Sequence, residues 1–170
     1  MRYLNLFLIA LCIFLGSCHH SEEPPKEVNL HIAEQYRPAE VTFKTSDKDF
    51  ADKAKEFDDK SFIVRSAEEL PDDPIGFPEL YRKINFRNYD LLLFYCVYRW
   101  DFDSYSNRFY RDRIENKYKW EIHLGVGEFP ESESEIRHFN RFAIKVKKLP
   151  ENADVEFWVS FSHLNWDWDN

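Results

Sequence analysis

Alternation of apolar and polar residues with a period of two restricts the fold of this chain more than any other feature. It occurs in three segments of the C-terminal half, 118–124, 141–147 and 155–162. In an extended strand this spacing puts the apolar side chains on one face and the polar ones on the other. Three such strands predict an antiparallel sheet or a sandwich, with one polar face on each strand.

Leu91–Tyr98, in the same half, is apolar at nearly every position. A strand of this kind is covered on both faces, which predicts that it lies at the centre of a sheet. Residues 107–114 are expected to add one more strand. Long connections are expected at 101–107 and 129–137.

The first third of the chain mixes short strands with short helices. Ser46 followed by Asp49 is typical of a helix start, because both side chains can accept hydrogen bonds from the free N–H groups of the first turn. Apolar residues then recur with the spacing of one helix face. These residues are Phe50, Ala54 and Phe57, and the strand-like pieces are 28–32, 41–45 and 62–64.

Two further helix patterns are short. One begins at Ser66 and is ended by Pro71, which cannot continue a helix, and the other runs from Pro78 to Lys83. The patterns together predict one α+β domain in which β-structure dominates. Its antiparallel sheet or sandwich carries one or two short helices in the N-terminal half.

Residues 1–17 have the pattern of a secretory signal. Arg2 supplies a positive charge, and the apolar stretch that follows, Tyr3–Leu15, is shorter than the roughly 20 residues that a membrane span needs. The stretch ends in Leu15-Gly16-Ser17-Cys18, which resembles a bacterial lipobox. The resemblance implies cleavage before Cys18, lipidation of Cys18 by fatty acyl chains such as palmitate, and attachment to a membrane. A soluble secreted protein cut near Ser17 is the alternative.

The polar, proline-bearing stretch 18–27 is expected to be a tether between the lipid and a single domain over 28–170. Ser21-Glu22-Glu23 resembles the export signals that bring lipoproteins of Bacteroidota-type bacteria to the cell surface. The resemblance implies a lipoprotein of the outer membrane. Whether it faces the periplasm or the cell exterior is open, because a plain linker has the same composition.

Cysteine usage agrees with this organisation. Cys12 would leave with the signal and Cys18 would carry lipid, so Cys96 would remain alone and no intrachain disulfide could form. Cys96 lies in an apolar segment and is expected to be a small buried side chain.

The order of the domain's segments resembles that of small lipoproteins of the same bacteria. The matching pieces are Ser66-Ala67-Glu68-Glu69-Leu70, Asn85-Phe86-Arg87-Asn88-Tyr89 and Leu91–Val97. These are capping and packing features, so the resemblance implies a fold and no activity.

Common catalytic and cofactor motifs are absent, and with 4 glycines in the whole chain a phosphate-binding loop is hard to build. We therefore expect no cofactor. The net charge of −8 disfavours a nucleic-acid binder, which needs cations for the phosphates. Asp101 and Asp103 have the spacing that starts a calcium loop. However, Ser106 replaces the usual Gly and Asp112 the closing Glu, so we expect a solvated loop and no metal.

Two groups of residues are candidate sites. Glu121 and His123 share the polar face of one strand and could meet His163 or a nearby acid, as a zinc-binding or acid–base group. Trp158 lies on a predicted polar face, where a flat apolar ring can bind a sugar or a protein. The C-terminus repeats this combination of indoles and carboxylates, in Trp166, Asp167, Trp168 and Asp169. These tail rings could equally complete the edge of the core.

The sequence thus predicts a lipid-anchored binding or interaction protein of the cell envelope or surface, without catalytic activity. Its partners would be the membrane, through the lipid, and an envelope protein or a glycan. A structural subunit of an outer-membrane assembly is one alternative, and an envelope hydrolase that uses Glu121 and His123 is another.

Overall fold

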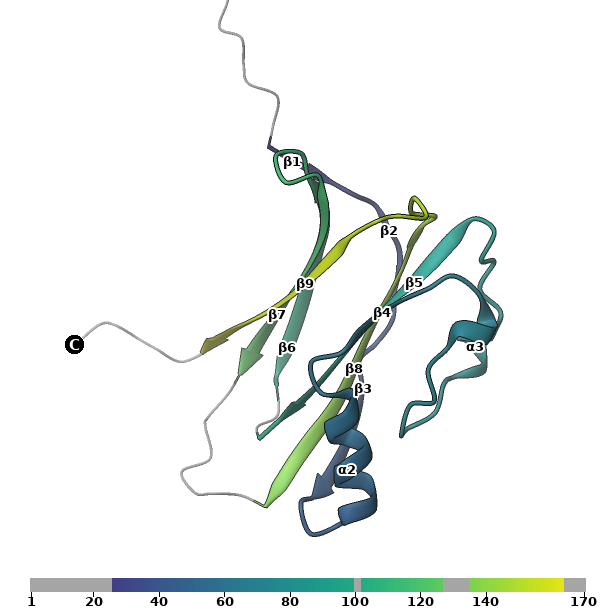
Figure 1. The fold of residues 1–170 in the computed structure, drawn as a ribbon. Coiled ribbons are helices and arrows are strands. Elements are labelled where there is room, and N and C mark those ends of the chain that lie inside the picture. Colours follow the sequence, from purple (N-terminus) through teal and green to yellow (C-terminus); the bar gives the residue numbers. More distant parts are fainter. Residues whose placement is uncertain (1–25, 100–101, 127–134, 164–170) are drawn as a thin grey trace, which may run out of the picture.

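The computed structural model describes residues 26–99, 102–126 and 135–163, apart from the side chain of His163. These residues form two sheets packed face to face (Figure 1). The first sheet has four strands, in the order β1 (Glu27–Asn29), β6 (Ser104–Asp112), β7 (Lys117–Val126) and β9 (Val155–His163). The second sheet has five strands. Four of them follow the order β2 (Ile32–Gln35), β8 (Ile136–Lys147), β5 (Tyr89–Tyr98) and β4 (Ser61–Val64). The fifth strand, β3 (Ala39–Lys44), pairs with β8 on the same side as β2.

The predicted class, a β-dominated α+β sandwich with short helices in the N-terminal half, is confirmed. Neighbouring strands are antiparallel with one exception, because β9 runs parallel to β7. The chain leaves the four-stranded sheet after β7, forms β8 in the other sheet, and returns as β9 in the direction of β7. The period of two is the same in both arrangements, so it could not reveal the parallel pair.

The strands β5 and β8 form the centre of the five-stranded sheet and pair over ten residues, from Tyr89 opposite Lys147 to Tyr98 opposite His138. The prediction that β5 is covered on both faces is confirmed. The predicted polar face of segment 141–147 is confirmed at Lys145 and Lys147, which are half-buried and exposed, and is wrong at the other two positions. Arg141 and Ala143, on that face, are 2% and 1% exposed. They lie beneath the loops and helices that cover this sheet.

The space between the sheets is filled mainly by aromatic and branched side chains. The stacked rings of Phe94 and Phe157, with centroids 6.2 Å apart, join the two sheets, and Trp120 is fully buried beside Phe157. Cys96 lies in this core as a free thiol and is 3% exposed, as predicted. The high aromatic content is therefore explained by a core that is built without a disulfide among the described residues.

A second apolar cluster covers the other face of the five-stranded sheet. Helix α2 (Lys48–Phe57) packs there through the predicted stripe, since Phe57 meets Tyr95 and Phe139, and Phe50 also meets Phe139. Asp47, not Ser46, caps this helix, because its carboxylate accepts a hydrogen bond from the N–H of Phe50. The cover is completed by Leu70, the loop 71–78 and α3 (Glu79–Arg82), which follow the 3-10 helix η1 (Ala67–Glu69).

The ends of some elements differ from the prediction. Strand β1 begins at Glu27, and Arg113 donates a backbone hydrogen bond to the carbonyl of Lys26, so the predicted tether ends before these residues. Strand β6 begins at Ser104, within a predicted connection. No helix in the described ranges is long and apolar enough to span a membrane.

Candidate functional site

The outer face of the four-stranded sheet is the candidate site. The helices lie on the far side of the five-stranded sheet, and no described helix covers this face (Figure 1). We call it the open face. Alternation along the strands places on it Glu27, Asn29, Ser106, Arg108, Tyr110, Asp112, Lys117, Lys119, Glu121, His123, Glu156, Trp158, Ser160 and Ser162.

Trp158 is the one large apolar side chain among these residues, and 57% of it is exposed. The register places it directly beside Glu121 of β7. Its neighbours along the same face of β9 are Glu156 and Ser160. The prediction that Trp158 lies on a polar strand face and is exposed is confirmed, so a flat apolar ring stands among carboxylates and hydroxyls.

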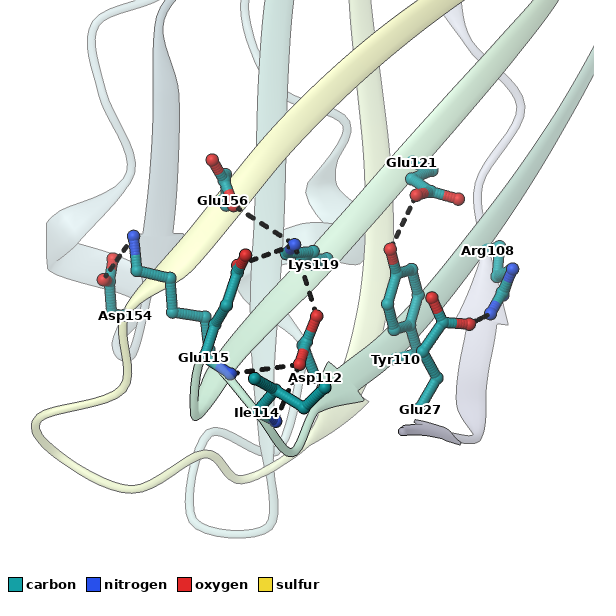
Figure 2. A network of polar contacts seen from close by, with 11 residues as sticks. Glu27, Arg108, Tyr110, Asp112, Ile114, Glu115, Lys119, Glu121, Asp154 and Glu156 are labelled. Carbon is teal, nitrogen blue, oxygen red and sulfur yellow. Dashed lines mark hydrogen bonds and ion pairs between the residues drawn. The ribbon is translucent and has the colours of Figure 1, made fainter. Parts of the chain in front are cut away.

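Glu121 is held by Tyr110, whose hydroxyl donates to Glu121 Oε1 at 2.7 Å (Figure 2). Burial, together with this carboxylate, raises the pKa of Tyr110 to about 12. The guanidinium of Arg108 lies 4.3 Å from the centre of the Tyr110 ring and is paired with Glu27. These contacts fix the position of the carboxylate beside Trp158.

Lys119 lies at the centre of an acidic cluster at one end of the open face (Figure 2). Its Nζ is 2.7 Å from Glu115 Oε2, 3.4 Å from Asp112 Oδ2 and 3.9 Å from Glu156 Oε2. The hydrogen bond to Glu115 and the nearby carboxylates raise the pKa of Lys119. The N–H groups of Glu115 and Ile114, which donate to Asp112, lower the pKa of that carboxyl. Lys117, on the same face of β7, pairs with Asp154, so two cations among four carboxylates leave this end of the face negative.

Glu121 and His123 share the open face as predicted, but among the described residues neither side chain is hydrogen-bonded to a second acid. His123 Nδ1 is 2.8 Å from Ser160 Oγ, and its Nε2 is 3.0 Å from Ser162 Oγ. The side chain of His163 lies outside the described part of the chain. Register explains the separation, since two residues along a strand are about 7 Å apart and each finds its partner on a different neighbouring strand.

A serine beside a histidine is the starting geometry of a hydrolase, so this pair bears on the enzyme alternative. In nucleophilic catalysis the second imidazole nitrogen is oriented by an acid. Here both nitrogens of His123 face serines, and Glu121 is engaged by Tyr110. In the described ranges no acid is hydrogen-bonded to His123, so the pair is not extended to a triad there.

The calcium-loop candidate does not close. Residues 104–112 form the extended strand β6, so Asp103 and Asp112 are separated by the whole strand, about 30 Å. Asp112 instead caps the turn between β6 and β7. In the described residues no group of three His, Cys, Asp or Glu side chains could hold a metal ion. Asp101 lies outside these residues.

Several other predicted sites also lie outside the described residues. They are the lipidation site Cys18, the export-signal residues Ser21, Glu22 and Glu23, and the tail residues Trp166, Asp167, Trp168 and Asp169.

One polar cluster was missed by the sequence analysis. Arg141 of β8 pairs with Asp73 of the loop 71–78, and both side chains are almost completely buried. Arg141 also donates to the carbonyl of Gly76 at 2.8 Å and stacks on the ring of Phe77 at 4.6 Å. An arginine in a regular alternation gives the same sequence signal whether it faces water or a covering loop.

A hollow of about 680 Å³ lies at one end of the molecule, between residues 35–40 and 102–105. Its floor includes Tyr105, whose hydroxyl donates to the carbonyl of Tyr36 at 3.4 Å. Glu40, on its rim, is already paired with His138 at 2.6 Å. Arg37 and Asp103 also line the hollow, which therefore carries charges of both signs, but its lining has no exposed tryptophan like Trp158 of the open face.

Comparison with known proteins adds no assignment, because no family model, curated protein or solved structure matches this chain.

Proposed function

We propose that this chain is a lipid-anchored binding protein of the cell envelope or cell surface, without catalytic activity, whose ligand is a protein or a glycan. The observation that carries the proposal is the exposed Trp158, on the sheet face that the described helices leave uncovered. A tryptophan of this kind loses much water-exposed apolar area when a ligand covers it, which is why tryptophan is common among the residues that dominate binding.

The surroundings of Trp158 suit recognition. Glu121 is oriented by Tyr110, and His123 and Ser160 are already hydrogen-bonded to each other. A ring with oriented acceptors beside it can stack on the apolar side of a sugar and bind its hydroxyls. The same ring attracts a lysine or arginine of a protein through its π-electrons, with Glu121 near enough to add charge.

The acidic charge of the chain favours a basic protein as the ligand. The net charge is −8, and on the open face several carboxylates surround Lys119. Charges of one sign raise the rate of encounter with a partner of the other sign, and salt weakens this effect.

The proposed anchor would hold this face close to a membrane. If Cys18 carries the lipid, the nine residues from Cys18 to Lys26 reach at most about 30 Å before β1 begins. A ligand would therefore be met within a short distance of the lipid surface, as expected for a protein that acts at the envelope.

The anchor is tested in intact bacteria that process lipoproteins. Cells receive a labelled fatty acid, and the native chain is compared with a Cys18→Ala variant. Label in the native chain alone supports the anchor, and label in neither chain contradicts it. Protease treatment of intact cells, with a Glu22→Ala, Glu23→Ala variant as control, then decides between surface display and a location inside the envelope.

The binding face is tested with the full chain in detergent against two sets of probes, soluble polysaccharides and short peptides rich in lysine and arginine. Replacing a residue of the hot-spot type costs about 2 kcal/mol or more, which is roughly a thirtyfold loss of affinity. We expect this loss for Trp158→Ala and a smaller one for Trp158→Phe. Unchanged affinity in both variants for every bound probe would overturn the proposal that Trp158 anchors the ligand.

A further inference from the structure

Strand β9 forms one edge of the four-stranded sheet, with β7 on one side and no described strand on the other (Figure 1). It is nine residues long, and its register with β7 is continuous. Other strands at sheet edges are shorter: β1 has three residues, β4 has four, β3 has six, and β2 has four with an irregular register. This strand is therefore the longest regular edge in the described part of the chain.

The direction of the backbone groups of β9 follows from one hydrogen bond. The N–H of Tyr118 in β7 donates to the carbonyl of Asp154 at 2.9 Å, so the backbone of residue 154 faces β7. Backbone N–H and C=O groups alternate in direction along a strand, as the side chains do. Glu156 and Trp158 therefore bond to β7, whereas Val155, Phe157 and Val159 direct their N–H and C=O groups away from it, to the outer edge.

Features that usually protect a sheet edge are missing from β9. In most proteins an edge strand is very short or carries prolines, lysines or bulges, because an unprotected edge can pair with a strand of another chain. Residues 155–163 read Val-Glu-Phe-Trp-Val-Ser-Phe-Ser-His, with neither proline nor lysine. An edge with these properties is a site at which an extended peptide adds as a further strand.

The two faces of β9 define which peptide fits. On the inner face, Phe157 and Val159 pack on the core, so the inward side chains of an added strand would meet apolar groups. On the open face, Trp158 and Glu156 stand beside the position of the added strand. A lysine or arginine there would lie over the indole and near carboxylates, which suits a basic side chain.

From these observations we infer that the outer edge of β9 binds an extended segment of a partner protein as an additional strand. This segment alternates apolar side chains toward the core with basic side chains toward Trp158. The inference rests on the proposed function and makes it more specific, because it selects a protein ligand and assigns most of the contact to the backbone.

The probe for this inference is a nine-residue peptide of alternating arginine and valine with blocked ends, added to the full chain in detergent. A peptide of the same composition, with the arginines in one block, is the matched control. We expect the alternating peptide to bind at least tenfold more tightly. Equal affinity of the two peptides, or binding of neither, would overturn the inference.

Backbone pairing is tested by two N-methylated forms of the alternating peptide, one methylated on its valines and the other on its arginines. Only one of the two sets can face β9 in a given orientation, so one form should lose binding while the other keeps it. Loss in the valine form indicates antiparallel addition, and loss in the arginine form indicates parallel addition. Retained binding of both forms would show contact through side chains alone and would overturn strand addition, while leaving the proposed function intact.

Hydrogen exchange and two variants give independent readouts. On binding, the amide protons of Val155, Phe157 and Val159 should become protected, while those of Glu156 and Trp158, already bonded to β7, change little. Val159→Pro removes one outward donor and should weaken binding at least tenfold, whereas Val159→Thr keeps it. In one outcome, Trp158→Ala leaves the affinity for the alternating peptide unchanged while N-methylation of the peptide still abolishes binding. That result would support strand addition at β9 and would contradict a contribution of Trp158 to it.

Discussion

The outer face of each sheet carries a cation paired with carboxylates, but the pair is buried on one sheet and partly exposed to water on the other. On the five-stranded sheet, Arg141 pairs with Asp73, and the two side chains are 2% and 0% exposed. On the four-stranded sheet, Lys119 lies among three carboxylates, with 15% of its side chain exposed and that of Glu115 half exposed. The first cluster is covered by the loop 71–78, whereas the second reaches water. The comparison separates a charge that holds the fold together from charges that remain available to a ligand.

Burial changes what each cluster contributes. A buried ion pair must be complete, because removal of one partner leaves a charge without solvent or counter-charge. An exposed pair loses little when broken, because water and salt replace the partner. Mutations on the five-stranded sheet should therefore change stability, and mutations on the open face should change binding.

The largest effect is expected at the buried pair. Asp73→Ala leaves the Arg141 guanidinium buried without its carboxylate, and the free energy of unfolding should fall by about 3–5 kcal/mol. Urea denaturation of the full chain in detergent measures this change. The double variant Asp73→Ala, Arg141→Met removes both charges and should recover part of the loss. If the single variant is as stable as the native chain, the pair does not hold the loop 71–78 in place.

Two tryptophans on opposite faces of the four-stranded sheet provide a matched test. Trp120 is fully buried and Trp158 is 57% exposed. Trp120→Ala should cost about 3–5 kcal/mol of unfolding free energy, as for other large aromatic residues in cores. Trp158→Ala should change stability by no more than about 0.5 kcal/mol while weakening ligand binding. Comparable losses of stability in the two variants would mean that Trp158 belongs to the core and not to a binding face.

Alternation in the sequence predicts correctly which side chains of a strand are buried and which are exposed, provided that one face of the sheet is in contact with water. Trp120 and Trp158 differ in their place in the alternation, and both were assigned correctly. Arg141 was assigned to a polar face because a covering loop from residues 71–78 cannot be seen in the local pattern of β8. The parallel pairing of β9 was missed for a related reason, since it depends on the path of the chain between sheets.

The candidate site was predictable only in part. The alternation was enough to place Trp158, Glu121 and His123 on one face. It could not assign their partners, because the contacts of Glu121 with Tyr110 and of His123 with Ser160 depend on strand order and register. Side-chain contacts across a sheet join residues that are far apart in sequence.

A smaller effect is expected at the exposed cluster. Lys119→Met removes the cation from among Asp112, Glu115 and Glu156 and leaves three carboxylates close together. Stability should fall less than in Asp73→Ala, and the loss should shrink as salt screens the repulsion. Urea denaturation at low and at 1 M sodium chloride tests this expectation. A loss that is independent of salt would show that the aliphatic part of Lys119, and not its charge, is what the fold requires.

The smallest effect concerns acid stability. The N–H groups of Glu115 and Ile114 lower the pKa of Asp112 below its usual value near 4. A lowered folded pKa means that the unfolded chain binds the proton more readily. The stabilisation from Asp112 is therefore fully present above its unfolded pKa and is lost as the pH falls through its folded pKa.

Asp112→Asn should reduce the loss of stability below about pH 4, because an amide in this turn no longer takes up a proton. Urea midpoints of the native chain and the variant between pH 6 and pH 2 measure the difference. Glu121→Gln is the control on the same face, since the hydroxyl of Tyr110 donates to that carboxylate and would also donate to the amide oxygen. Parallel pH profiles for the native chain and Asp112→Asn would show that the turn's N–H groups do not stabilise the charged carboxylate. Acid sensitivity would then have its source elsewhere in the fold.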